Sequence, residues 1–206
     1  MTDLFTLIPP AELAAFLAAG IVLNLTPGAD VMFATASGLQ GGARAGAVAG
    51  LGVGLGGLLH VTLAVLGVSA LLAASPAALT ALKWAGAGYL LYLAVKSWRA
   101  GAALPGQGEA RAGRALWRGF VTNALNPKVA LFILSLLPQF TDPARGPVWQ
   151  QILILGLLFM VTGTIITCGY GLLAGMAGQA LGRRMGALNK LAALLYGALA
   201  LRIVRG

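Results

Sequence analysis

Charged side chains are scarce in this chain. Only 9% of its 206 residues are Asp, Glu, Lys or Arg, whereas 59% are hydrophobic, and the mean hydropathy is +0.88. A soluble domain of this length cannot bury so large a share of apolar side chains. The composition therefore excludes a soluble globular protein and predicts a protein of the lipid bilayer.

Histidine, cysteine and acidic residues are scarcer still. The chain has one His, one Cys and five acidic residues. Zinc sites take several Cys or His ligands and calcium sites take several carboxylates, so we expect no metal and no cofactor. The single Cys168 lies within an apolar segment and cannot form a disulfide inside the chain.

Long apolar runs are what the sequence has instead. A membrane-spanning helix needs roughly 20 apolar residues. Charge clusters and Pro/Gly breaks divide the chain into six such segments, at 11–38, 45–72, 79–97, 116–137, 148–175 and 186–204. Asp3 and Glu12 precede any Lys or Arg, unlike a secretory signal, so we expect the first span to be retained. The predicted fold is an all-α polytopic membrane protein with six transmembrane helices.

Basic residues are unevenly divided between the loops. One side holds Arg44, Lys96, Arg99, Arg111, Arg114, Arg118, Arg183, Arg184 and Lys190, and the other holds Lys83, Arg145, Arg202 and Arg205. Loops rich in Lys and Arg stay in the cytoplasm, which predicts both termini on the non-cytoplasmic side. The net charge of +9 then serves topology and contact with anionic lipids, and no nucleic-acid partner is expected.

An internal repeat relates the two halves of the chain. Residues 25–28 (LTPG) align with 125–128 (LNPK) at a shift of 100, and the same shift places Gly46 on Gly146. Three spans separate the copies, so the halves lie in opposite orientations. We predict a first three-helix repeat over 1–99, a flexible cytoplasmic loop over 100–115 and a second three-helix repeat over 116–206.

Two prolines occupy matching positions in this repeat. Pro27, followed by Gly28, and Pro127 each remove a backbone donor, which predicts that helices 1 and 4 are broken into half-helices. The freed backbone groups cannot face lipid and must line protein or water. Ordinary helix kinks are the alternative.

Asp30, Lys128 and His60 are the ionisable residues expected at membrane depth. A charge at a helix centre costs roughly 2.5 to 3.5 kcal/mol on insertion scales, so such residues usually pair or line a cavity. A carboxylate, an ammonium and half-helix amino ends together fit a zwitterion such as an amino acid. Alternatively, Asp30 and Lys128 form a structural ion pair. His60 is either a proton relay or a hydrogen-bonded core residue.

Several sequence blocks carry a resemblance to a known family. They are residues 27–30, 42–57, 82–92, 126–132 and 137–140, of which the NPK and GAGYLLY blocks are the most specific. In order, spacing and length the chain resembles the lysine-exporter/homoserine-threonine-resistance (LysE/RhtB) family of bacterial amino-acid exporters. Ala29 stands where that family usually has a second proline. The resemblance implies export of amino acids from the cytoplasm, driven by a proton or ion gradient.

Further polar residues have two interpretations each. Thr162, Thr167 and Tyr170 give the fifth span a polar side, which either lines the transport path or forms interhelical hydrogen bonds. Asn126 either caps the second half of the fourth span or offers its amide to the substrate.

Glycines recur every fourth residue in the second span, at Gly42, Gly46, Gly50 and Gly54. This spacing predicts a helix face for close packing against a neighbouring helix. The alternative is a sliding surface between moving halves. The glycine face also favours a homodimer. Residues 52–57 match G-x-G-x-x-G, but no strand precedes them and no acid follows at the required distance, so a dinucleotide site is not expected.

The sequence therefore predicts a secondary active transporter that exports amino acids or close derivatives across the bacterial inner membrane by alternating access. An enzyme is not expected, because a second membrane Asp for an aspartyl protease is absent and Ser37 with His60 is the only obvious pair for a serine protease. Its expected partners are the amino acid and membrane lipids. The alternatives are a lipid-handling or structural membrane protein, or an inorganic-ion exporter of similar form.

Overall fold

The computed structural model describes residues 4–74 and 108–177 without a gap, together with residues 77, 81, 84, 85, 87, 88, 91, 92, 95, 98, 99, 190, 193, 194, 197, 198 and 201. Regular structure in these residues is helical throughout. Most of the third and sixth predicted spans, and the first part of the 100–115 loop, lie outside the described residues.

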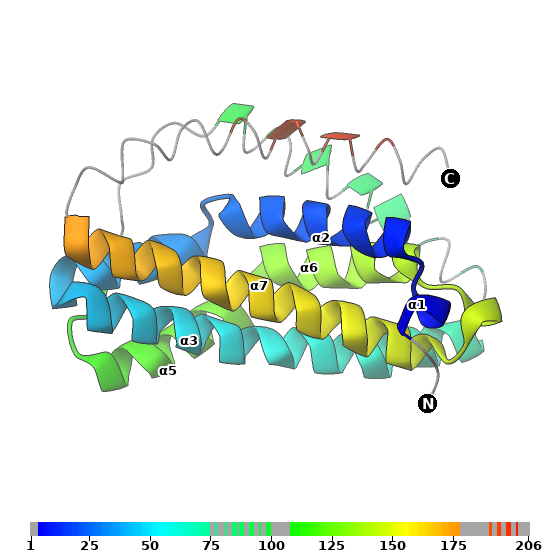
Figure 1. The fold of residues 1–206 in the computed structure, drawn as a ribbon, viewed down its shortest axis with the longest axis horizontal. Coiled ribbons are helices and arrows are strands. Elements are labelled where there is room, and N and C mark those ends of the chain that lie inside the picture. The colour runs from blue at the N-terminus through cyan, green and yellow to red at the C-terminus, as the bar shows by residue number, and fades with distance from the viewer. Residues whose placement is uncertain are drawn as a thin grey trace.

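Figure 1 shows most of the described helices running alongside one another. The described helices are α1 (Leu4–Leu7), α2 (Pro10–Leu25), α3 (Ala29–Ala74), α5 (Ala112–Ala124), α6 (Pro127–Leu136) and α7 (Val148–Ala177), with 3-10 turns η1 (Leu137–Phe140) and η2 (Pro143–Arg145) before α7. Helix α3 packs along α7 and α5, and α2 packs on α7.

Two of these helices are long and apolar enough to cross a membrane. They are Ala29–Gly67 within α3 and Val148–Met176 within α7, with mean hydropathies of 1.9 and 2.3. The pair Ala112–Ala124 and Pro127–Phe140, bent by 51°, makes a third span if it counts as one. The predicted class, a helical membrane protein, is confirmed at this level.

Helix α3 contains a sharp turn at Gly42. The φ and ψ angles of Gly42 are 78° and 178°, in a region open to glycine and strained for other residues. Figure 1 shows the first arm of α3 running to one end of the molecule and the second arm returning from it. Added Cβ atoms at Gly38 and at Gly46 would both meet Gly171, so the two arms flank the same part of α7. The turn falls in the stretch predicted to lie between the first two spans.

Gly46, Gly50 and Gly54 lie on the face of α3 that contacts α7. A Cβ at Gly50 would lie 2.6 Å from the Cys168 nitrogen, and Cβ atoms at Gly46 and Gly54 would meet Gly171 and Thr164. Side chains here would hold the two helices apart. Gly42 departs from this pattern, because a Cβ there would meet nothing within 4 Å and the residue serves the turn instead.

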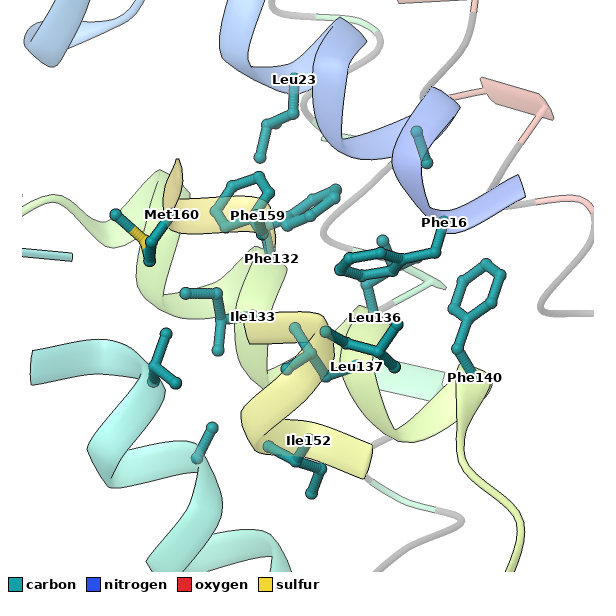
Figure 2. Packing of buried hydrophobic residues seen from close by; sticks show 14 of the residues in the cluster. Phe16, Leu23, Phe132, Ile133, Leu136, Leu137, Phe140, Ile152, Phe159 and Met160 are labelled. Carbon is teal, nitrogen blue, oxygen red and sulfur yellow. The ribbon is translucent and has the colours of Figure 1, made fainter. Parts of the chain in front are cut away.

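The main apolar core lies between α2, α6 and α7 (Figure 2). Phe132 stacks on Phe159 with ring centroids 5.2 Å apart, and Phe16 meets Phe140 edge-on at 5.4 Å. A smaller cluster lies beside α5 and comprises Phe33, Ala34, Ala49 and Ala115.

Candidate functional site

Helical structure is interrupted beside both prolines. Helix α2 ends at Leu25 and α3 begins at Ala29, so 26–28 lie between helices; α5 ends at Ala124 and α6 begins at Pro127. Proline has no N–H, so at each position the carbonyl four residues earlier lacks its helical donor. These carbonyls belong to Leu23 and Asn123.

Lys128 fills the gap left by Pro27. Its Nζ donates to the Leu23 carbonyl at 3.1 Å and to the Thr26 carbonyl at 3.0 Å, both at the carboxyl end of α2. A cation is favoured there because the carbonyl dipoles point toward it. Gly28 leaves the room for this contact, since a Cβ at Gly28 would lie 3.2 Å from Lys128 Nζ.

His60 fills the corresponding gap left by Pro127. Its Nε2 lies 2.8 Å from the Asn123 carbonyl, which also accepts the Asn126 N–H at 2.8 Å. Because a carbonyl oxygen can only accept, Nε2 of His60 carries the hydrogen. The imidazole is buried, with 7% of the residue exposed.

Asp30 extends from the first half to the break in the second. Its Oδ1 accepts from Nδ2 of Asn126 at 2.9 Å, and its Oδ2 accepts from Nδ2 of Asn123 at 3.0 Å. The carboxylate belongs to the first turn of α3, where the helix dipole favours a negative charge. The amide of Asn126 both donates and accepts. Its Nδ2 donates to Asp30, and its Oδ1 accepts the Lys128 N–H at 3.0 Å and so caps α6.

A small cavity lies between these groups. Its volume is about 20 Å³, and its lining is Leu23, Asn24, Thr26, Gly28, Asp30, Val31, Lys128, Val129 and Thr167. That is space for about one water molecule and not for an amino acid. The described conformation is therefore closed around the charged groups.

The structure separates the predicted polar residues of α7. Thr167 lines the cavity, whereas the Thr162 hydroxyl donates to Leu158 O at 2.9 Å and receives the Asn24 amide at 3.4 Å. The Tyr170 hydroxyl donates to Leu25 O at 3.1 Å. Thr162 and Tyr170 thus tie α7 to α2 at the first break.

Asn123 and Asn24 belong to the site although sequence reasoning did not select them. Asn123 stands four residues before Pro127. A proline removes the helical donor of the carbonyl four residues earlier, so this spacing could have marked Asn123 as a residue of the site. Asn24 gave a weaker one, as a single amide in an apolar segment.

A second polar cluster surrounds Glu109 at the start of α5. Its carboxylate accepts from the Arg111 N–H and Arg114 at 3.1 Å each and from Arg118 at 3.4 Å. The hydrogen bond from the Arg111 backbone, followed by the neighbouring guanidinium groups, holds the pKa of Glu109 below its usual value. The Glu109 N–H donates to Ser37 Oγ at 3.0 Å, while His60 bonds to Asn123, so the Ser37 and His60 considered as a catalytic pair have separate partners.

Comparison with known proteins places the chain among transport proteins. It is 36% identical over 164 residues to the homoserine/homoserine lactone efflux protein of Salmonella typhi, covering 78% of this chain and 79% of that protein. It is 34% identical to an uncharacterized membrane protein of Vibrio cholerae serotype O1 (80% and 82% covered) and 27% identical to the leucine efflux protein of Salmonella choleraesuis (62% of each). No solved structure matches the chain.

The family profile of the LysE type translocators matches residues 21–206, a longer stretch than any of these pairwise matches. The matched stretch includes both breaks and every residue of the site. This match confirms the resemblance seen in the sequence blocks. The chain belongs to the LysE type translocator family.

Proposed function

We propose that the protein is a secondary active exporter of amino acids or close derivatives across the bacterial inner membrane. The observation that carries the proposal is the exchange of charged side chains between the two breaks. Asp30 of the first half meets the amides beside Pro127, and Lys128 of the second half meets the carbonyls beside Pro27. The family and the efflux proteins among its relatives support the same function.

In the proposed architecture, two inverted three-helix repeats form six spans, with helices 1 and 4 broken at Pro27 and Pro127. Support comes from the equivalent placement of the breaks, 100 residues apart, and from the equivalent loss of a helical donor at Leu23 and Asn123. Termini on the non-cytoplasmic side remain the prediction of the basic-residue distribution. A homodimer likewise stays a prediction.

The closed site is satisfied by groups that imitate an amino acid. Amide N–H groups donate to Asp30 where a substrate ammonium would donate, and carbonyl oxygens accept from Lys128 where a substrate carboxylate would accept. A substrate can therefore replace the internal partners group for group. The cavity of about 20 Å³ must enlarge to admit it, which requires the helices around the breaks to separate.

Proton coupling follows from competition at Asp30. A proton that reaches the carboxylate from the outer side neutralises it and removes the attraction for the substrate ammonium. Release of that proton to the cytoplasm restores the binding form, and the two halves rock between the two openings. The exported amino acid is thereby exchanged for an inward proton.

For the substrate we propose a small amino acid of the homoserine kind. A relative is named for homoserine and homoserine lactone efflux. In this chain, Asn24, Thr26 and Thr167 give the cavity amide and hydroxyl groups beside the charged pair. In the closed site Asn24 and Thr26 donate to carbonyls of α7 and α2. A substrate hydroxyl can add hydrogen bonds to such groups, whereas a purely aliphatic side chain cannot.

The direct test is efflux from proteoliposomes loaded with labelled L-homoserine, L-leucine and L-lysine under an imposed pH gradient. We expect gradient-driven loss of homoserine from vesicles with the wild-type protein, and none with Asp30→Asn, which keeps the shape but not the charge. Size-exclusion profiles and protease accessibility verify that both proteins are folded and inserted. Absence of efflux with verified wild-type protein would reject the exporter and favour a lipid-handling or structural role.

A further inference from the structure

Asn123 carries one polar atom that its surroundings leave unused. Its Nδ2 donates to Asp30 and its backbone carbonyl accepts from His60. Its Oδ1 is buried and has no hydrogen-bond partner within the described part of the chain, and the residue is 2% exposed. A buried acceptor without a donor is unfavourable and calls for an explanation.

The orientation of this amide follows from the charge on Asp30. An ionised carboxylate accepts only, so the Asn123 NH₂ faces it and Oδ1 faces away. On that far side lies Gly57, where an added Cβ would be 3.3 Å from Oδ1. The same Cβ would also meet the Met160 side chain, so Oδ1 faces an apolar corner.

A half-turn of the amide would exchange its nitrogen and its oxygen. In the turned position Oδ1 accepts from a hydrogen-bond donor that arrives at Asp30, while the NH₂ group moves to the side of Gly57 and Met160. The hydrogen bonds that the new donor makes to both Oδ1 and Asp30 therefore have to offset the one that Nδ2 gives up. A substrate ammonium is such a donor and has three hydrogens to share. The backbone of Asn123 can stay in place meanwhile, since His60 holds its carbonyl.

Asn126, the other amide on Asp30, is not equivalent. Its Oδ1 accepts the Lys128 N–H at 3.0 Å, so turning this amide would break the cap of α6 and aim its NH₂ at a backbone donor. Of the two amides that hold Asp30, only that of Asn123 can turn without losing a hydrogen bond elsewhere.

We propose that Asn123 is a ligand of the substrate ammonium, which it binds through Oδ1 together with the Asp30 carboxylate. This assignment rests on the proposed export of amino acids. It makes the residue a determinant of specificity for substrates that carry an ammonium group. In the closed site the same side chain occupies the place of that group with its own amide hydrogens.

The test compares Asn123→Leu with wild type in proteoliposomes loaded with graded concentrations of labelled L-homoserine. We expect the half-saturation concentration to rise roughly 10- to 100-fold, the range for one hydrogen bond to a charged group, with a smaller change in maximal rate. Asn123→Ser, which keeps an oxygen, should recover part of the loss. The matched control is Thr35→Val, because the Thr35 hydroxyl is also buried without a partner among described residues and lies about 140° around the helix from Asp30.

A second measurement separates binding from folding. The analogue 2,4-dihydroxybutanoate has a hydroxyl in place of the ammonium, and its inhibition of homoserine efflux measures discrimination at that position. Wild type should discriminate strongly against it. Asn123→Leu should lose part of this discrimination, because Asp30 still attracts the ammonium. Ligand-dependent thermal shifts of purified protein give the same comparison if efflux is too slow. Unchanged half-saturation and unchanged discrimination in folded Asn123→Leu would overturn the assignment alone. Wild type that exports no amino acid would overturn it together with the proposed function.

Discussion

The two breaks are alike in what proline removes and differ in what replaces it. At Pro27 the Leu23 carbonyl accepts from the ammonium of Lys128 as well as from the Thr26 N–H, and at Pro127 the Asn123 carbonyl accepts from the imidazole of His60 as well as from the Asn126 N–H. In each case the side-chain donor comes from the other half of the chain, so each half completes the backbone of its counterpart.

The difference lies in the chemistry of the donors. A Lys side chain ends in a compact ammonium with three donors, whereas each imidazole nitrogen donates at most one hydrogen. The first break is therefore held by a charge through its contact with two carbonyls. The second is held by one hydrogen bond from an imidazole nitrogen. The two breaks therefore differ in whether an ammonium on two carbonyls or an imidazole on one replaces the missing helical donor.

Removal of the fixed charge should have the largest effect. Lys128→Met keeps a long side chain but leaves the carbonyls of Leu23 and Thr26 without this donor and removes the cation beside Asp30. Loss of one member of a buried charged network costs about 3 to 5 kcal/mol, so we expect homoserine efflux to fall at least about 100-fold. Lys128→Arg keeps the charge in a larger group and should retain more activity. Equal efflux by Lys128→Met and wild type would show that the first break needs no fixed charge.

Crowding the same contact should have a smaller effect. Gly28→Ala places a Cβ 3.2 Å from Lys128 Nζ, so the ammonium must shift from its two carbonyls by a few tenths of an ångström. We expect efflux to fall about tenfold, as for the loss of one charged hydrogen bond. Gly169→Ala is the matched control, because a Cβ there meets nothing within 4 Å. A similar loss in both variants would trace the effect to backbone flexibility instead.

Replacement of the imidazole donor should change the pH profile more than the rate. Gln at position 60 can still donate to the Asn123 carbonyl but cannot change its charge. For His60→Gln we expect a rate at neutral pH within about threefold of wild type, the effect of a neutral hydrogen bond altered in geometry. The dependence of efflux on pH between 5.5 and 7.5 should flatten. An unchanged profile would assign all titration to Asp30.

The sequence predicts those features of the site that depend on a residue and its near neighbours, and not those that depend on contacts between distant segments. A proline's missing N–H and the scarcity of membrane charges are local facts, and they marked Asp30, Lys128 and the neighbourhoods of Pro27 and Pro127. The partner of each freed carbonyl depends on how the chain crosses itself, so the Lys128–Leu23 and His60–Asn123 contacts were not predictable from spacing.

Gly42 illustrates a second limit of sequence reasoning. A four-residue spacing suggested that it packs on a neighbouring helix with Gly46, Gly50 and Gly54. The same residue type also permits a positive φ, and at Gly42 that property is used for the turn between the two arms of α3. Spacing alone does not distinguish a glycine needed for its small size from one needed for its dihedral angles.

Replacement of Glu109 should have the smallest effect. It tests whether a carboxylate outside the two breaks contributes to the response of the protein to acid. The folded-state pKa of Glu109 is lowered, first by the Arg111 N–H, so its ionised form stabilises the fold above the ordinary value of about 4.5. That stabilisation is lost as the pH falls through the lowered pKa. Glu109→Gln should therefore have a slightly lower thermal stability than wild type at pH 7. On acidification below pH 4.5, its thermal stability should fall less than that of wild type. Between pH 5.5 and 7.5 its efflux profile should match that of wild type, because Glu109 stays ionised throughout; a shift in this range would place part of the pH response at the start of α5 instead of at the breaks.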